Sequence, residues 1–501
     1  MNIKEAKEEI VRSVEMYLDK DAFGEYNIPY MKQRPIFMIG APGIGKTAIV
    51  EQVASELGIA LVSYSMTHHT RQSALGLPYI EERTYDGKTV KVSEYTMSEI
   101  IAAVYRVMEA SGKREGILFL DEINCLSETL APAMLLFLQY KTFGNQRLPQ
   151  GWVIVTAGNP PQYNKSVKEF DVATLDRLKC FAIEEDFGVW KSYAYQNGIH
   201  ASIITFLEIN PEWFYSIRTT VDGVQYVTAR GWEDLSMAIG IYEKKCFNVD
   251  KRLIMQYITD TEIAGKFGIY YDLFKKYKSD YKVEDILNGI VTEELLERVK
   301  KAGFDERVSL LGLILENLNV QFDAVVHQEA VLERVVKILR LAKKESAQSD
   351  LTQFFEKYDM MLQAEHNSAE AANSLSSDQK REYRDAIILL QEYKTICDKE
   401  HEQKKQFPLI KKRFDTQAKR HQSYVKKVQQ QLEKAFDFLE QAWGNGQEMI
   451  LFMTELTANA DSMHFIELWG SASYFQFNQE LLIYDVHQNL QREITALFSP
   501  L

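Results

Sequence analysis

Short apolar runs alternate with amphipathic stretches over the first 185 residues of the chain. The apolar runs are bounded by turn residues, and the stretches between them repeat their apolar positions every three or four residues, as helices do. An amphipathic helix is predicted over residues 3–20, ahead of the first run. Strands are predicted near residues 36–39, 60–65, 117–120, 152–157 and 179–184. This alternation predicts an α/β fold, an αβα core around a five-stranded parallel sheet.

From residue 186 onward the pattern is mostly helical. The core of a small helical lid is predicted from Trp190, Tyr193, Ile203, Phe206 and Leu207. Residues 364–377 contain few large apolar side chains, which favours a linker. We therefore expect four domains: an α/β domain (1–185), a helical lid (186–290), a helical connector (291–375), and a helical hairpin with an aromatic-rich end (376–501).

Residues 379–443 are rich in Lys, Gln and Glu and predict two helices, broken at Phe407-Pro408. The second helix has an apolar stripe formed by Val425, Val428, Leu432, Ala435, Leu439 and Ala442. Such a stripe needs a partner, either the first helix in an antiparallel hairpin or another protein docked on a protruding arm. The aromatic tail over residues 449–501 packs either on the body or on a neighbouring molecule.

The first strand runs into a glycine-rich turn that ends in Lys-Thr. Glycines allow backbone N–H groups to approach a phosphate closely, the lysine adds a cation, and the helix that follows presents its positive end. Thr47 offers a hydroxyl to Mg²⁺. The predicted nucleotide-binding residues are Gly40, Ala41, Pro42, Gly43, Ile44, Gly45, Lys46 and Thr47.

Two acids, Asp121 and Glu122, end the third predicted strand. Asp121 is suited to hold Mg²⁺, and Glu122 to take a proton from the water that attacks the γ-phosphate. Asn159 follows the next strand, just before two prolines, and its neutral amide suits the orientation of that water or contact with the γ-phosphate.

Together the segments GAPGIGKT, ILFLDE and VTAGNPP, with Leu175-Asp176-Arg177 and Val227–Trp232, resemble an AAA+ ATPase of the MoxR-like group over about residues 30–290. The resemblance implies a P-loop (Walker A) at 40–47, Walker B at Asp121 and Glu122, and sensor 1 at Asn159. It also implies that Arg177 is an arginine finger for a neighbouring subunit and that Arg230 is the sensor 2 arginine. Lys165, Lys168 and Arg218 are alternatives to these two arginines.

The resemblance further implies ATP and Mg²⁺ as ligands, a ring of self-associated subunits, expected to be a hexamer, and a protein substrate. The expected function is chaperone-like remodelling of a partner, possible partners being von Willebrand A-type domain proteins. Residues 79–95 predict a hairpin with a turn at Asp86-Gly87. In the MoxR-like group a hairpin at this place often faces the central pore or a partner, which makes it a candidate substrate-contacting loop; the alternative is a solvated surface hairpin. The alternative function is a nucleotide-gated scaffold whose C-terminal helices recruit a partner with little turnover.

Composition narrows these expectations. The 501 residues carry a net charge of −13, without a long basic block, which disfavours nucleic acid as a partner. A GTP-specific switch is disfavoured because residues 164–167 lack the carboxylate of a guanine-reading segment.

No apolar stretch predicts a membrane span, residues 1–20 do not resemble a secretory signal, and the four cysteines have no repeat spacing. The adjacent His68 and His69 have no matching ligand pair, which disfavours zinc. The expected location is the cytoplasm.

Overall fold

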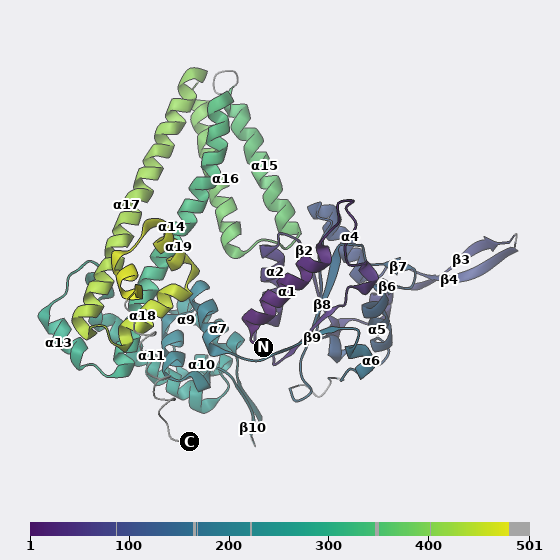
Figure 1. The fold of residues 1–501 in the computed structure, drawn as a ribbon, viewed down its shortest axis with the longest axis horizontal. Coiled ribbons are helices and arrows are strands. Elements are labelled where there is room, and N and C mark those ends of the chain that lie inside the picture. Colours follow the sequence, from purple (N-terminus) through teal and green to yellow (C-terminus); the bar gives the residue numbers. More distant parts are fainter. Residues whose placement is uncertain are drawn as a thin grey trace, which may run out of the picture. The chain divides into compact units, whose positions relative to one another are not determined.

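The structure, a computed structural model, describes residues 1–86, 88–163, 167, 169–220, 223–345, 350–400 and 402–479 (Figure 1). The chain divides into two compact units. The first comprises residues 1–186 and 355–391, and the second comprises residues 187–354 and 392–501. Each unit has its own hydrophobic core.

A five-stranded parallel sheet forms the centre of the first unit, in the order β2-β5-β8-β1-β9. The strands are β1 (Ile36–Gly40), β2 (Ala60–Ser65), β5 (Gly116–Asp121), β8 (Trp152–Gly158) and β9 (Lys179–Ile183). Every residue of β8 is buried, as expected of a central strand covered on both faces. The predicted α/β fold and its five strands are confirmed.

Helices cover the sheet. The helices α4 (Glu99–Ser111) and α5 (Ala131–Tyr140) share a core with Leu118, Leu120 and Ile154. Alternate residues of a strand point to opposite faces, so Ile117 and Phe119 face the other side, where α2 (Lys46–Glu56) packs on β5. The predicted N-terminal helix is α1 (Ile3–Leu18), which buries Ala6, Ile10, Val14 and Tyr17 and packs on α2 and β9.

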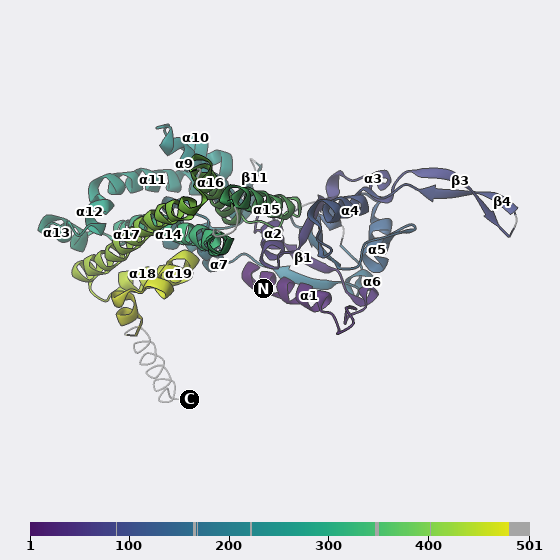
Figure 2. The same cartoon turned by 90° about the horizontal axis from the view of Figure 1, so that it is seen from above.

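A two-stranded antiparallel hairpin, β3 (Pro78–Tyr85) and β4 (Lys88–Tyr95), projects beyond the sheet of the first unit (Figures 1 and 2). Most of its residues are exposed. The predicted hairpin is therefore present. Asp86 has the positive φ of 50° that suits a tight turn, and Gly87 lies outside the described residues.

The edge strand β2 is covered by the loop between α15 (Leu351–Ala371) and α16 (Ser377–Lys399). The Leu61 N–H donates to the carbonyl oxygen of Ala372 (2.8 Å), and the Asn373 side-chain amide donates to the carbonyl oxygen of Leu61 (3.4 Å). Lys113 Nζ donates to Ser374 Oγ at 2.6 Å. These contacts satisfy backbone groups that an open sheet edge leaves unpaired.

The prediction of a linker over residues 364–377 is wrong. Residues 364–371 belong to α15, and only residues 372–376 form a loop, in which Ala372 is fully buried. Alanine is a good helix former, and its small side chain suits close packing against a sheet edge, so a shortage of large apolar residues did not mean flexibility here.

The second unit is almost entirely helical. Its helices are α7 (Phe187–Gln196), α8 (Ala201–Ile209), α9 (Ala229–Lys244), α10 (Lys251–Tyr257), α11 (Thr261–Tyr281), α12 (Val283–Leu287), α13 (Glu293–Lys301), α14 (Phe304–Glu345), α17 (Gln403–Trp443), α18 (Gln447–Ala458) and α19 (Ala460–Trp469). One hairpin, β10 (Ser216–Thr220) and β11 (Gly223–Val227), joins α8 to α9. The predicted core residues Trp190, Ile203, Phe206 and Leu207 are buried, and Tyr193 is partly buried.

One continuous core joins the first helices of this unit to the C-terminal helices. A group of charges borders this core: the partly buried Lys191 Nζ pairs with Glu208 Oε2 at 2.7 Å and with Oε1 of the buried Glu455 at 2.6 Å. Burial raises the pKa of Glu455. The aromatic tail packs on this body as far as residue 479, since Tyr474 and Phe477 are buried in the same core.

The long helices α14 and α17 lie side by side in the second unit (Figure 2). By length and composition α14 is apolar enough to cross a membrane. Most of its apolar segment is buried inside the unit, and a buried core helix has the same length and composition. The predicted stripe of α17 from Val425 to Ala442 is buried, and it packs on α14, α12, α13 and α18. At the other end of α17, Arg413 Nε pairs with Glu392 Oε1 of α16 at 2.6 Å.

The break predicted at Phe407-Pro408 is wrong, because Pro408 lies inside α17, while α16 ends at Lys399 and α17 begins at Gln403. A proline within the first turn of a helix removes no hydrogen bond. Pro408 is the sixth residue of α17 and lies near its N-terminus. The helix therefore continues through Pro408 with the loss of about two backbone hydrogen bonds or fewer.

Candidate functional site

The loop between β1 and α2 is shaped by its glycines. At Gly40 a Cβ atom would lie 2.7 Å from the carbonyl oxygen of Ile183 and would clash with it. Gly45 has a φ of 97°, a left-handed conformation that favours glycine, and it caps α2 without a side-chain hydrogen bond. The first N–H groups of α2 are therefore available to an anion bound in this loop.

Lys46 lies buried beneath the loop. Its Nζ donates to the carbonyl oxygens of Gly40 and Ala41, both at 2.8 Å, and to Asn159 Oδ1 at 3.0 Å. The ammonium group thus joins the loop after β1 to the loop after β8. Phosphate oxygens would compete with these three acceptors for the same cation.

Asp121 is the last residue of β5, and Glu122 follows it. Thr47 Oγ1 donates to Asp121 Oδ2 at 3.0 Å, and the Glu122 N–H donates to Asp121 Oδ1 at 2.9 Å. Glu122 has a φ of 56°, which is uncommon for a residue with a side chain. Such strain occurs often at functional sites, where the surrounding structure maintains it.

Two polar residues that sequence reasoning missed support this arrangement. Ser65, the last residue of β2, donates through Oγ to Glu122 Oε2 at 3.1 Å. Asn124 donates through Nδ2 to the carbonyl oxygen of Asn159 at 2.7 Å, and it packs so close to Gly158 that a Cβ there would lie 2.5 Å from Asn124 Oδ1. Ser65 ends the edge strand β2 and Asn124 lies in the turn after β5, so both residues are at the carboxyl ends of strands, where ligands of open α/β sheets bind.

Thr47 and Asp121 are the residues that fit Mg²⁺. A hydroxyl and a carboxylate 3.0 Å apart offer the hard oxygen ligands that Mg²⁺ prefers, and this ion usually completes its shell with phosphate oxygens and water. Across the described residues, no group of three or more His, Cys, Asp or Glu side chains is arranged to hold a metal by itself.

The two predicted arginines lie in different units of the chain. Arg177 is exposed just after α6 (Val172–Leu175), and Arg230 is exposed at the start of α9 in the second unit. Their predicted roles stay predictions.

Of the alternative cations, Arg218 pairs with the buried carboxylate of Asp260 at 2.5 Å. Asp260 also caps α11 through the N–H groups of Glu262 and Ile263. This pairing gives Arg218 a structural role within the second unit. Lys165 and Lys168 lie outside the described residues.

The family model for the ATPase family associated with various cellular activities (AAA) matches residues 36–173. A search of curated proteins finds no significant match to the chain. The matched range includes the glycine loop, Asp121, Glu122 and Asn159, and it ends before Arg177. The match supports an ATP-binding ATPase domain in this part of the chain.

Proposed function

We propose that the protein is an ATP-hydrolysing AAA+ motor of the MoxR-like type, which assembles into a hexameric ring and remodels a partner protein in the cytoplasm. The proposal rests on two hydrogen bonds at the carboxyl ends of the strands. One joins Lys46 to Asn159, and the other joins Thr47 to Asp121. Ligands of open α/β sheets bind at this edge.

The proposed role of each residue follows from its charge and its position in the site. The N–H groups of the loop and the ammonium of Lys46 bind the phosphates, and Thr47 with Asp121 holds Mg²⁺, which when bound neutralises phosphate charge. Glu122 takes a proton from the attacking water, and Asn159 orients that water. Arg177 supplies a cation to the nucleotide of the neighbouring subunit, and Arg230 contacts nucleotide from the lid.

The hairpin of β3 and β4 is the proposed substrate-contacting element. It exposes Tyr79, Ile80 and Tyr85. Aromatic and branched apolar side chains on a projecting hairpin suit contact with an unfolded or extended protein segment. A von Willebrand A-type domain protein is the proposed partner class, on the resemblance alone.

The trans role of Arg177 is tested by mixing variants. Arg177→Ala should lose most ATP hydrolysis, because an arginine finger contributes about 10³-fold or more to turnover. Mixing it with Glu122→Gln chains, which lack the base but keep the arginine, should restore part of the activity. Arg147→Ala, which changes another exposed arginine of the same unit, is the control and should hydrolyse ATP normally.

Absence of rescue in rings shown by native mass to contain both chains would contradict a trans role. The ring itself is tested by turnover across a protein concentration series, which should rise steeply as ring-sized species form. Tight ATP binding by a monomer with negligible turnover at every concentration would favour the nucleotide-gated scaffold instead.

A further inference from the structure

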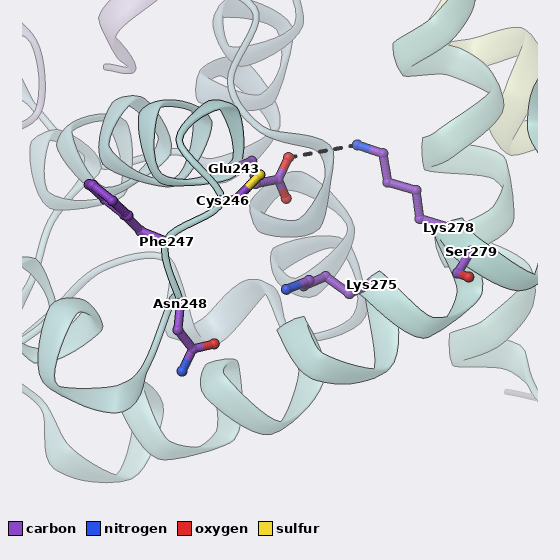
Figure 3. Close-up of a pocket in the computed structure, with 7 residues that line it drawn as sticks. All are labelled: Glu243, Cys246, Phe247, Asn248, Lys275, Lys278 and Ser279. Atoms are coloured by element: carbon purple, nitrogen blue, oxygen red, sulfur yellow. Dashed lines mark ion pairs between the residues drawn. The ribbon is translucent and has the colours of Figure 1, made fainter.

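A hollow of about 550 Å³ lies in the second unit, between the end of α9 and the last two turns of α11 (Figure 3). It is lined by Glu243, Cys246, Phe247, Asn248, Lys275, Lys278 and Ser279. None of these residues belongs to the nucleotide site described above. The hollow is open to solvent, since every residue that lines it except Glu243 is exposed.

The wall formed by residues 246–248 has a defined backbone. The N–H of Phe247 donates to the carbonyl oxygen of Tyr242 (2.8 Å), and the N–H of Cys246 donates to that of Glu243 (3.0 Å). Cys246 has a φ of 55°, so α9 ends in a Schellman motif with a left-handed residue. Phe247 packs edge-to-face on Tyr242, with ring centroids 5.5 Å apart, while 55% of Phe247 stays exposed.

The one acid in the wall already has partners. Tyr271 OH donates to Glu243 Oε1 at 2.9 Å, His200 Nε2 lies 3.4 Å from the same oxygen, and Lys278 Nζ lies 3.8 Å from Glu243 Oε2. The hydrogen bond from His200, with the charges and hydrogen bonds of these neighbours, lowers the pKa of Glu243 to about 2. The carboxylate therefore stays charged and is held against the body of the unit.

Lys275 is the cation without such a partner. Its ammonium lies 5.8 Å from the centre of the Tyr271 ring, and among the described residues it makes no ion pair with a carboxylate. Figure 3 shows its side chain extending from α11 toward the loop of residues 246–248. Lys275, Lys278 and Ser279 lie on one face of α11, because residues three and four apart are neighbours on a helix.

We propose that this hollow binds a small phosphorylated ligand, with Lys275 and Lys278 contacting the phosphate, Asn248 and Ser279 adding neutral donors, and Phe247 covering an attached ring. Two ammonium groups and two neutral donors around one space match a group with several anionic oxygens. The lining carries two ammonium groups and one carboxylate, and Lys275 is the cation that makes its net charge positive in a chain with a net charge of −13.

The first test measures binding of two probes, inorganic pyrophosphate and ADP, to full-length chains carrying Lys46→Ala to weaken the nucleotide site. Lys275→Ala in that background should weaken binding about tenfold, since a charge-assisted contact is lost. Lys276→Ala is the matched control, because Lys276 is exposed on the same helix but does not line the hollow. It should leave binding unchanged.

Binding of pyrophosphate as tight as that of ADP would show that phosphate groups suffice, and tighter binding of ADP would show that the Phe247 wall also contributes. Either result supports the proposal. It is overturned if neither probe binds at millimolar concentration, or if Lys275→Ala and Lys276→Ala have the same effect.

The second test uses Cys246 as a reporter on the same Lys46→Ala chain. Cys246 and Cys180 are both free and exposed, but only Cys246 lines the hollow. The bound probe should slow alkylation of Cys246 severalfold, measured by peptide mass spectrometry, and leave Cys180 unchanged. Equal rates at Cys246 with and without a probe that binds would overturn this location.

Discussion

Ser65 determines where the Glu122 carboxylate lies in this structure. Its hydroxyl donates to Glu122 Oε2 at 3.1 Å and holds the carboxylate against the end of β2. A hydrogen bond to a charged acceptor fixes the position of that acceptor. Ser65 is thus a positioning residue, which acts on the proposed reaction through Glu122.

The substitution Ser65→Ala should raise basal ATP turnover. Loss of a bond of about 1 kcal/mol corresponds to about a fivefold rise in kcat, with little change in KM because the phosphate-binding loop is untouched. Ser63→Ala is the control, since Ser63 is an exposed serine two residues earlier on β2. An unchanged or reduced kcat in Ser65→Ala would show that the hydrogen bond does not restrain the base.

A second prediction for a single residue concerns Lys141 and the pH dependence of folding stability. The side chain is almost fully buried, and its Nζ donates to the carbonyl oxygen of Tyr30 at 2.8 Å and lies 4.2 Å from the Tyr30 ring centre. Burial lowers the pKa of Lys141 from its ordinary value of 10.5 to about 7. Between these values the unfolded chain binds more protons than the folded one, so this group makes stability rise with pH.

The difference in the free energy of unfolding between Lys141→Met and the native chain should therefore depend on pH. Relative to the native chain, the variant should lose stability by about 1.4 kcal/mol for each pH unit between roughly 7 and 10, because over that range Lys141 is neutral in the folded native chain but still protonated in the unfolded one. Denaturant unfolding at several pH values measures this. Lys91→Met, on the exposed hairpin, should show no such slope, and a flat difference for Lys141→Met would refute the account.

At the scale of elements, the loop of residues 372–376 covers the open edge of the sheet. Ala372 is fully buried, and its carbonyl oxygen accepts from the Leu61 N–H. A charged side chain at this position must either be buried without a partner or lift the loop from β2. Either outcome affects the strand that carries Ser65 at its end.

Ala372→Glu should therefore destabilise the first unit by about 2–4 kcal/mol and increase hydrogen exchange along β2. Ala364→Glu places the same charge on an exposed position of α15 and should change neither quantity appreciably. Hydrogen exchange by mass spectrometry, read for peptides of β2, distinguishes the two variants. Equal protection of β2 in both would mean that the loop does not hold the edge.

The sheet could be predicted from sequence because its signals are local. Buried runs such as Gly116–Asp121 are bounded by turns, and the glycine loop carries its own conformational requirements between Gly40 and Thr47. The contacts of Ser65, Asn124 and Ala372 could not be predicted, because each joins segments distant in sequence. The prediction of a break at Pro408 failed for a different reason. The effect of a proline depends on where the helix begins, and the start of α17 is only weakly determined by the local sequence.

At the scale of the whole molecule, the central claim is that this chain hydrolyses ATP with Glu122 as the base. The most direct measurement compares steady-state ATP hydrolysis and ATP binding for the native chain and Glu122→Gln, with Glu128→Gln as a control for loss of an acid nearby. The account predicts that Glu122→Gln binds ATP as the native chain does but turns over about 10²- to 10⁴-fold more slowly, while Glu128→Gln is unaffected. Undiminished turnover in Glu122→Gln would contradict it.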